Sequence, residues 1–276
     1  MSTYKDLLYT ARKILMEKEI TDADLDAWYL LSNVFGMSRT DYLLQENKNA
    51  AEEDALVYLQ LIQRRTEHVP LQYIIGSQEF MGLEFFVTPH VLIPRQDTEL
   101  LVEEALKISD GKTVLDMCTG SGCIIISIAK LVKLKKAVGV DISDDALELA
   151  VRNADHQEVR VEFIRSNLFE RVEGYYDVIV SNPPYIPTKV INTLMPEVKE
   201  HEPLLALDGR EDGLFFYRRI TADLKKHLCS KGSILFEIGH DQGEAVSRIL
   251  EEEGFKDIMI KKDLSGLDRI VSAIRP

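Results

Sequence analysis

The sequence of 276 residues has few cysteines, no long apolar runs and little positive charge, and each shortage excludes a class of protein. Its three cysteines, Cys118, Cys123 and Cys229, do not form a ligand set for zinc, so we expect no metal site. No apolar run approaches the roughly 18 residues that cross a membrane, and no basic-then-apolar leader opens the chain. We therefore expect a cytoplasmic protein that binds no membrane and keeps its cysteines reduced.

Positive charge is scarcer than negative charge, with 33 lysine and arginine residues against 46 aspartate and glutamate residues and a net charge of −13. Phosphate contacts dominate binding to nucleic acids, and the chain has no long basic stripe to make them. We therefore expect no stable binding to DNA or RNA. An acidic surface favours a basic protein partner instead, because opposite charges steer the two molecules together.

The tetrapeptide Asn182-Pro183-Pro184-Tyr185 is the most specific motif in the chain, and it follows an apolar run at 176–181 that is typical of a buried strand. Ligands of open α/β sheets bind where strands end in this way. The two prolines remove backbone donors and leave carbonyl acceptors, Asn182 adds a side-chain carbonyl, and Tyr185 adds an aromatic face. This pocket suits a planar group that carries an NH2, such as a carboxamide or the amine of a base. The alternative is an ordinary proline-containing turn after a strand.

A glycine-rich turn, Cys118-Thr119-Gly120-Ser121-Gly122, lies between a predicted strand at 112–117 and a helix that begins at Cys123. A dinucleotide-binding turn needs a third glycine where this chain has Ile125. Asp116 ends the strand, and its carboxylate would repel a pyrophosphate but attract an ammonium group. The cofactor should therefore be cationic at that end.

Asp141 ends the next predicted strand, at 136–140, where a carboxylate can accept hydrogen bonds from both hydroxyls of a ribose. A ribose and an ammonium group without phosphates describe S-adenosylmethionine rather than NAD. Taken alone, Asp141 would also suit the N-cap of a helix over 144–153.

These segments resemble the HemK/PrmC family, the glutamine methyltransferases of peptide chain release factors. The resemblance covers roughly residues 60–240, and the matching segments are 70–76, 92–99, 116–122, Asp141, 181–185, 201–203, 206–209 and 212–214. It implies an α/β fold of the class I, Rossmann-like type, with a seven-stranded, mostly parallel sheet whose last two strands make an antiparallel end. We expect an N-terminal helical substrate-docking domain at 1–70, a linker with a β-hairpin at 71–95 and a catalytic domain at 96–276.

The resemblance also assigns roles to individual residues. Asn182, Pro183 and Tyr185 would be catalytic, and Pro184 would complete the substrate-binding loop. The cofactor S-adenosylmethionine, which leaves as S-adenosylhomocysteine, would be bound by Asp116, Cys118, Thr119, Gly120, Ser121, Gly122, Asp141, Asn167, Leu168 and Asn182. The methyl group would go to the glutamine of the Gly-Gly-Gln loop of a release factor.

Two residues depart from the family pattern. Cys118 replaces the first glycine of the turn, and a residue with a Cβ is expected there only with a negative φ. Asn167 replaces an aspartate that would accept from the adenine amine, and its side-chain carbonyl oxygen can do the same without the charge.

A mechanism without a side-chain acid or base follows from the proposed loop. Acceptors on Asn182 and Pro183 would hold the two N–H bonds of the substrate amide and favour the charge that develops on its nitrogen. Tyr185 would stack on the amide plane and align the nitrogen with the methyl group. Glu237 ends another predicted strand and could approach the site, although a place at the edge of the core suits it better.

Three other functions remain open at this stage. A related glutamine methyltransferase acts on a ribosomal protein, and adenine methyltransferases of DNA or RNA use a similar amine-binding loop. A non-catalytic module that binds the cofactor and regulates a translation factor is the third.

Several local features carry predictions for the fold. The pattern Thr21-Asp22-Ala23-Asp24 predicts a capping box for a helix over 25–35 that Gly36 ends, and Trp28 should lie in the core of a helical bundle. Alternation over 72–91 predicts a two-stranded hairpin, and Asp97 is expected to cap the helix that follows.

Overall fold

The computed structural model describes residues 2–276 and divides the chain into two compact units. The first unit extends to Gly76 and also contains Met195–His201, while the second unit comprises Ser77–Leu194 and Glu202–Pro276. The residues of the predicted linker from Ser77 onward belong to the second unit. No helix within residues 2–276 is long and apolar enough to cross a membrane.

The first unit is a helical bundle around one hydrophobic core. Its helices are α1 (Tyr4–Glu17), α2 (Ala23–Phe35), α3 (Arg39–Gln45), α4 (Glu52–Thr66), α5 (Leu71–Ile75) and α10 (Pro196–His201). Trp28 is 5% exposed and packs edge-to-face against Tyr42, which confirms its predicted place in the core. The prediction of a hairpin beginning at residue 72 was wrong at its start, because residues 71–75 form α5.

The ends of α2 follow the prediction at one terminus only. Gly36 adopts a left-handed conformation with φ of 59° and ends the helix, as predicted. The capping box was wrong, because Asp22 is the N-cap and its side chain makes no capping hydrogen bond. Its φ and ψ of −103° and 36° lie outside the extended region from which a cap side chain reaches the first turn.

A buried arginine ties the segment Met195–His201 to the rest of the first unit. The guanidinium of Arg65 donates to Asp26 at 2.6 Å and to Glu197 at 2.9 Å. The imidazole Nε2 of His201 also lies 3.0 Å from the carbonyl oxygen of Glu67. A segment far along the sequence thus becomes part of the N-terminal bundle.

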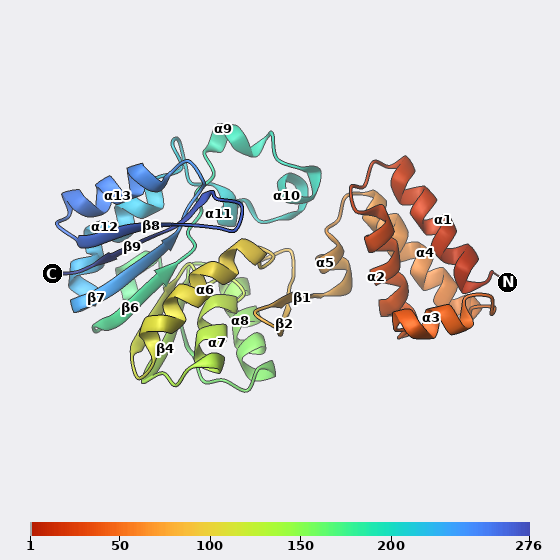
Figure 1. Ribbon diagram of the computed structural model, residues 1–276, viewed down its shortest axis with the longest axis horizontal. Helices are drawn as coiled ribbons and strands as arrows, with labels where there is room; N and C mark the ends of the chain where they lie inside the picture. Colours follow the sequence, from red (N-terminus) through yellow and green to blue (C-terminus); the bar gives the residue numbers. More distant parts are fainter. Residues whose placement is uncertain (1) are drawn as a thin grey trace. The chain divides into compact units, whose positions relative to one another are not determined.

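The second unit is built on a seven-stranded sheet of order β5-β4-β3-β6-β7-β9-β8, as expected for a class I methyltransferase fold (Figure 1). The strands are β3 (Thr113–Met117), β4 (Lys136–Asp141), β5 (Glu162–Arg165), β6 (Tyr176–Ser181), β7 (Leu228–Glu237), β8 (Lys256–Lys262) and β9 (Asp268–Ile274). The first five strands in the sheet order pair in parallel, and β9 pairs antiparallel with both β7 and β8. The predicted antiparallel end of the sheet is therefore confirmed.

Helices cover both faces of this sheet (Figure 1). One hydrophobic cluster joins the sheet to α6 (Gln96–Ser109) and α7 (Cys123–Leu131), and another joins it to α12 (Phe215–His227) and α13 (Gly243–Glu252). The remaining elements are the hairpin β1 (Ser77–Phe80) and β2 (Leu83–Phe86), α8 (Asp144–His156), the 3-10 helix η1 (Leu168–Arg171), α9 (Thr188–Ile191) and α11 (Leu204–Leu207).

Strand register brings the predicted motifs to one edge of the sheet. Met117, at the end of β3, is paired with Val140 of β4 and with Ser181 of β6. The residues that follow these three strands therefore emerge side by side at the carboxyl edge, where open α/β sheets bind their ligands.

Candidate active site

A cavity of about 450 Å³ opens at this carboxyl edge, within the size range of small-molecule sites. It is lined by nine of the residues predicted from the sequence, namely Cys118, Thr119, Gly120, Ser121, Asp141, Asn167, Leu168, Asn182 and Pro184. Asp116, Gly122, Pro183 and Tyr185 do not line it and lie behind or beside the wall. Sequence reasoning assigned no role to several further lining residues, among them Arg95, Thr98, Phe215, Phe216 and Arg219.

The glycine-rich turn has a different backbone from the one predicted at its first position. Cys118 has a φ of +64°, so the expectation of a negative φ was wrong. Gly120 and Gly122 of the same turn also have positive φ, at 54° and 81°. Cys118 adopts this left-handed conformation although it has a Cβ. Such a conformation costs a non-glycine residue about 1–3 kcal/mol, and the surrounding packing must offset that cost.

Asp141 both faces the cavity and holds the turn. Its carboxylate accepts from the backbone N–H of Gly120 at 2.9 Å and from that of Ser143 at 3.0 Å. The side chain of Ser143, rather than Asp141, caps α8 by accepting from the N–H of Ala146. Burial raises the pKa of Asp141, and its three backbone hydrogen bonds oppose that shift. The carboxylate oxygens retain lone pairs that could accept from the hydroxyls of a ribose.

Asp116 lies beneath the turn and is fully buried. Its Oδ2 accepts a hydrogen bond of 2.6 Å from the hydroxyl of Thr119. Burial, above all other effects, raises its pKa from 3.8 to about 7. Because Asp116 does not line the cavity, its expected attraction for an ammonium group would act across the turn.

Asn167 keeps one acceptor available at the cavity wall. Its side-chain Nδ2 donates to Glu170 Oε1 at 2.6 Å, so its carbonyl oxygen is turned away from that partner. An amine such as that of adenine needs this kind of acceptor. The cavity therefore fits a ribose beside Asp141 and an amine beside Asn167, which are two features of the predicted S-adenosylmethionine.

Asn182 has a defined orientation within the loop that follows β6. Its Nδ2 donates to the hydroxyl oxygen of Thr98, 3.3 Å away, at the start of α6. With the NH2 end engaged, the carbonyl end is the one available to a ligand in the cavity. The role of Asn182 as an acceptor for a substrate amide stays a prediction, and this orientation is compatible with it.

Tyr185 is the last residue of the same loop, and contacts to its backbone hold it in place. Its backbone oxygen accepts from the Gln242 side chain at 3.0 Å, and two glycines pack against its backbone. A Cβ at Gly213 would lie 2.3 Å from the Tyr185 carbonyl oxygen, and one at Gly209 would lie 2.7 Å from its carbonyl carbon. Only glycine fits at these two positions, and each glycine lies in one of the segments that match the family, 206–209 and 212–214.

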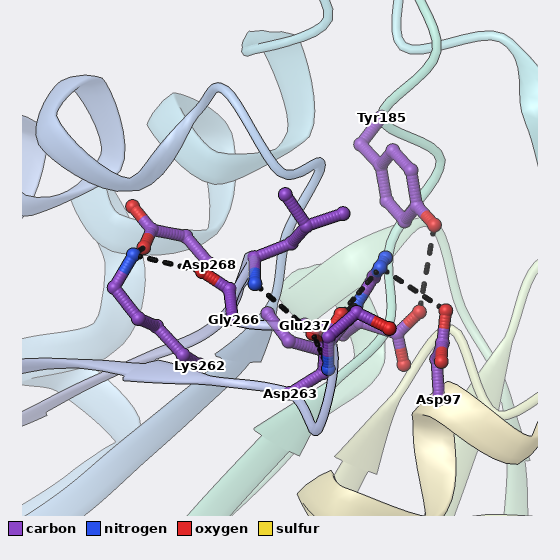
Figure 2. Close-up of polar contacts among 10 residues, drawn as sticks. Asp97, Tyr185, Glu237, Lys262, Asp263, Gly266 and Asp268 are labelled. Atoms are coloured by element: carbon purple, nitrogen blue, oxygen red, sulfur yellow. Dashed lines mark hydrogen bonds and ion pairs between the residues drawn. The ribbon is translucent and has the colours of Figure 1, made fainter.

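Glu237 is 2% exposed at the end of β7 and does not line the cavity, which agrees with the favoured interpretation from sequence that it lies at the edge of the core. The Tyr185 hydroxyl points at Glu237 Oε1 across a long contact of 3.5 Å (Figure 2). Burial raises the pKa of Glu237 from 4.5 to about 7, although the positive charge of Arg269 opposes that rise.

The N-terminus of α6 is anchored beside these groups by an ion pair. Arg269 contacts Asp97 at 3.1 Å and Asp263 at 3.0 Å, and so connects α6 to the turn between β8 and β9. Figure 2 shows Asp97 at the start of its helix, close to Glu237 and Tyr185. The prediction that Asp97 caps α6 was wrong, because Arg95 is the N-cap and Asp97 lies in the first turn.

The buried acids predict a distinct pH dependence of stability. Between pH 4.5 and about 7, Glu237 keeps its proton in the folded state but loses it in the unfolded state. The unfolded state then binds fewer protons, so the contribution of Glu237 to the free energy of unfolding is lost as pH rises through this window. Glu237→Gln should flatten the slope by at most about 1.4 kcal/mol per pH unit. Urea denaturation at pH 5, 6 and 7 measures the slope, and identical slopes for both proteins would contradict the assignment.

Two family models match the chain. The PrmC N-terminal domain model matches residues 6–76, and the methyltransferase small domain model matches residues 95–201. The first match corresponds to the helical unit, and the second begins just before α6 and includes both the glycine-rich turn and the Asn182–Tyr185 loop.

Relatives with known names resemble the chain over nearly its full length. The release factor glutamine methyltransferase of Geobacter sulfurreducens is 42% identical and that of Clostridium acetobutylicum is 43% identical, and each match covers 98% of this chain and 98% of the relative. A solved methyltransferase from Pyrococcus furiosus has the same fold, with a TM-score of 0.55 and 16% identity over 77% of this chain and 98% of that one. The chain therefore belongs to the release factor glutamine methyltransferase family.

Proposed function

We propose that this protein transfers a methyl group from S-adenosylmethionine to the side-chain amide nitrogen of a glutamine in peptide chain release factors. The orientation of Asn182 carries this proposal, since its carbonyl end is left for an NH2 group in the cavity. Relatives that are named for this activity match the chain over nearly its full length, which supports the same substrate. In the family, the methylated glutamine is that of the Gly-Gly-Gln loop.

The residues of the loop perform the protein's part of the reaction. S-adenosylmethionine, when bound, supplies an electrophilic methyl group. The Asn182 carbonyl oxygen accepts a hydrogen bond from one N–H of the substrate amide, which orients the nitrogen and favours the positive charge that develops there. Pro183 does not line the cavity, so its predicted part as the second acceptor has no support from the cavity lining. Transfer would break the S–CH3 bond of S-adenosylmethionine and form an N–CH3 bond, with S-adenosylhomocysteine as the leaving group and one proton released from the nitrogen to solvent. Tyr185 does not line the cavity, so it supports the loop through its own packing, and its predicted stacking on the amide plane has no support from the cavity lining.

The cofactor is held by the turn and its neighbours. Asp141 would accept hydrogen bonds from the ribose, Asn167 would accept one from the adenine amine, and the backbone of the turn would enclose the remaining end. Asp116 places a carboxyl group beneath that turn, where an ionised form favours a cationic ligand.

Transfer of a tritiated methyl group tests the proposal against its alternatives. The purified protein is incubated with labelled S-adenosylmethionine and, separately, with a release factor, ribosomal proteins, DNA and RNA. Label should enter the release factor alone. Label in a ribosomal protein or a nucleic acid would contradict the proposed substrate. No label anywhere would favour a module that binds the cofactor without catalysis.

We further propose that the helical unit docks the body of the release factor, in the cytoplasm where such a substrate is found. Exposed apolar side chains on this unit support the proposal, notably Leu43 and Leu44 on α3, which are 69% and 77% exposed. An acidic chain would also draw in a basic partner, and added salt should slow that association.

Replacing both leucines of α3 by serine should raise KM for the release factor about tenfold and leave kcat and cofactor affinity unchanged, because the lost apolar contact is with substrate. Leu264→Ser is the matched control, since Leu264 is fully exposed in the turn between β8 and β9. Steady-state kinetics separate the two parameters. An unchanged KM in the double variant would remove α3 from the docking surface.

A further inference from the structure

Arg95 lies in the cavity wall, where a buried carboxyl group holds its side chain. Its guanidinium donates from Nη2 to Glu202 Oε1 at 2.5 Å, and the side chain is 40% exposed and lines the cavity. The side chain of Glu202 is only 1% exposed. A buried carboxyl group is costly unless a partner compensates it, so Arg95 stabilises Glu202. Glu202 in turn restricts the positions that are open to the guanidinium.

This pair joins two segments that match the family but contain no residue of the proposed reaction. Arg95 belongs to the segment 92–99 and Glu202 to the segment 201–203, and both residues lie in the second unit. Arg95 is the N-cap of α6, but its side chain makes no capping hydrogen bond. The side chain is therefore engaged by Glu202 on one side and faces the cavity on the other.

The hydrogen bond between the two side chains does not depend on the charge of Glu202. Burial raises the pKa of this carboxyl group, and the charge and the hydrogen bond of Arg95 oppose that rise. A carboxylate and a protonated carboxyl group both have an oxygen that accepts from a guanidinium. Within residues 2–276, Glu202 Oε2 is buried without a hydrogen-bond partner, so Oε1 is the oxygen that holds Arg95.

Arg95 can offer only donors to a ligand. A guanidinium has five N–H groups and no acceptor, and the hydrogen bond to Glu202 uses one of these groups, on Nη2. A ligand group that contacts Arg95 from the cavity must therefore be an acceptor, such as a carbonyl or carboxylate oxygen.

Arg95 lies one helical turn from the residue that orients Asn182. The N–H of Thr98 donates to the backbone oxygen of Arg95 at 3.1 Å, and the Thr98 hydroxyl accepts from Asn182 Nδ2 at 3.3 Å. All three residues line the cavity. The start of α6 thus brings a donor, on Arg95, to the part of the cavity where Asn182 has an acceptor. A carboxamide needs both, because it has an NH2 that donates and a carbonyl oxygen that accepts.

Two other arginines line the cavity but suit this task less well. Arg210 contacts Asp208 at 3.3 Å, and its side chain is 57% exposed. Arg219 also lines a smaller neighbouring cavity together with Asn167, the predicted partner of the adenine amine. Arg95 is therefore the arginine best placed for the substrate amide.

We propose that Arg95, held by Glu202, binds the carbonyl oxygen of the target carboxamide while Asn182 binds its NH2. The proposal rests on the proposed function, since the carboxamide is that of a release factor glutamine. It adds a requirement for an oxygen beside the nitrogen, so the site selects a carboxamide over an aliphatic amine, which has no such acceptor.

The contact should act on binding rather than on the chemical step. As the amide nitrogen gains positive charge, the carbonyl oxygen loses part of its negative charge, so Arg95 binds this oxygen best before transfer. Removing the contact should therefore raise Kd and KM for the release factor without lowering kcat.

A double-mutant cycle tests the contact by binding alone. The protein is saturated with S-adenosylhomocysteine, so that no transfer occurs, and is titrated with a release factor that has either its loop glutamine or a methionine in that place. Arg95→Met should weaken binding of the glutamine form about 10- to 100-fold, as expected for one hydrogen bond to a charged group. It should change binding of the methionine form by less than about threefold, because the oxygen is absent. Equal effects on both forms would overturn the proposal.

Two further variants complete the cycle. Arg218→Met is the matched control, because Arg218 contacts Asp212 at 2.6 Å and does not line the cavity, and both forms should bind to it as they do to the wild type. Glu202→Leu releases the guanidinium of Arg95 and should weaken binding of the glutamine form selectively. Unchanged binding of that form would overturn the part given to Glu202.

Titration calorimetry with S-adenosylhomocysteine distinguishes the substrate from the cofactor, whose methionine end also carries a carboxylate. The affinity should change by less than about threefold in Arg95→Met and Glu202→Leu, which also shows that both variants are folded. A tenfold loss in Arg95→Met alone would assign Arg95 to that carboxylate and overturn the proposal. A wild type that neither binds nor methylates a release factor would reject the proposed function and this inference with it. Methylation of the release factor without coupling between Arg95 and the glutamine would reject this inference alone.

Discussion

Asn182→Ala is expected to lower the kcat of methyl transfer by about 10²- to 10³-fold, the range for losing one preorganised polar group at a reacting centre. The alanine removes the oxygen that receives a substrate N–H and also frees the Thr98 hydroxyl from its partner. Cofactor affinity should change far less, because the turn at 118–122 and Asp141 supply most of the predicted cofactor-binding residues. Single-turnover transfer to a release factor measures the effect.

Asn192→Ala provides the matched control for this substitution. Asn192 follows α9 on the exposed surface and does not line the cavity, so kcat should stay at the wild-type value. Near-normal turnover in Asn182→Ala would contradict the assignment of the amide-binding loop.

Asp141→Ala is expected to weaken S-adenosylmethionine binding by about 1–3 kcal/mol, because two ribose hydroxyls lose a charged acceptor. The carboxylate also holds the N–H groups of Gly120 and Ser143, so part of the loss will come from a loosened turn. Titration calorimetry measures the dissociation constant directly.

Asp141→Asn separates these two contributions. The amide oxygen can still accept from the turn but without the charge, so its affinity should lie between those of the wild type and the alanine variant. NADH should not bind the wild type measurably. Tight NADH binding, or an unchanged S-adenosylmethionine affinity in Asp141→Ala, would contradict the interpretation of the glycine-rich turn.

The sequence predicted well the parts of the site that are local in the chain. The turn at 118–122 and the loop at 182–185 each carry their chemistry within a few residues, and each directly follows a strand. Because parallel strands end at the same edge, finding the strands was enough to bring the two motifs together.

The missed parts depend on contacts between distant segments. Thr98 and Asn182 are 84 positions apart in the sequence, and Tyr185 and Glu237 are 52 apart. No periodicity or spacing relates such pairs, so Thr98 received no role and the contact between Tyr185 and Glu237 was not predicted. Likewise, Arg65 and Glu197 are 132 positions apart, and contacts such as their ion pair place residues 195–201 with the first unit.

Cys118 illustrates a different limit of sequence reasoning. The intrinsic preference of a residue with a Cβ argues for a negative φ, yet the turn imposes +64°. The position of the turn between β3 and α7, and the hydrogen bonds that hold it, outweigh that local preference. Propensity predicted the existence of the turn but not the conformation of this residue.

The most direct test of the proposed function is the position of the added methyl group. A release factor is incubated with the protein and S-adenosylmethionine, digested, and its peptides are sequenced by mass spectrometry. The methyl group should be found on the side chain of the glutamine in the Gly-Gly-Gln loop and on no other residue. A methyl group on any other residue, or a release factor that stays unmodified while a nucleobase or another protein is methylated, would contradict the proposed function.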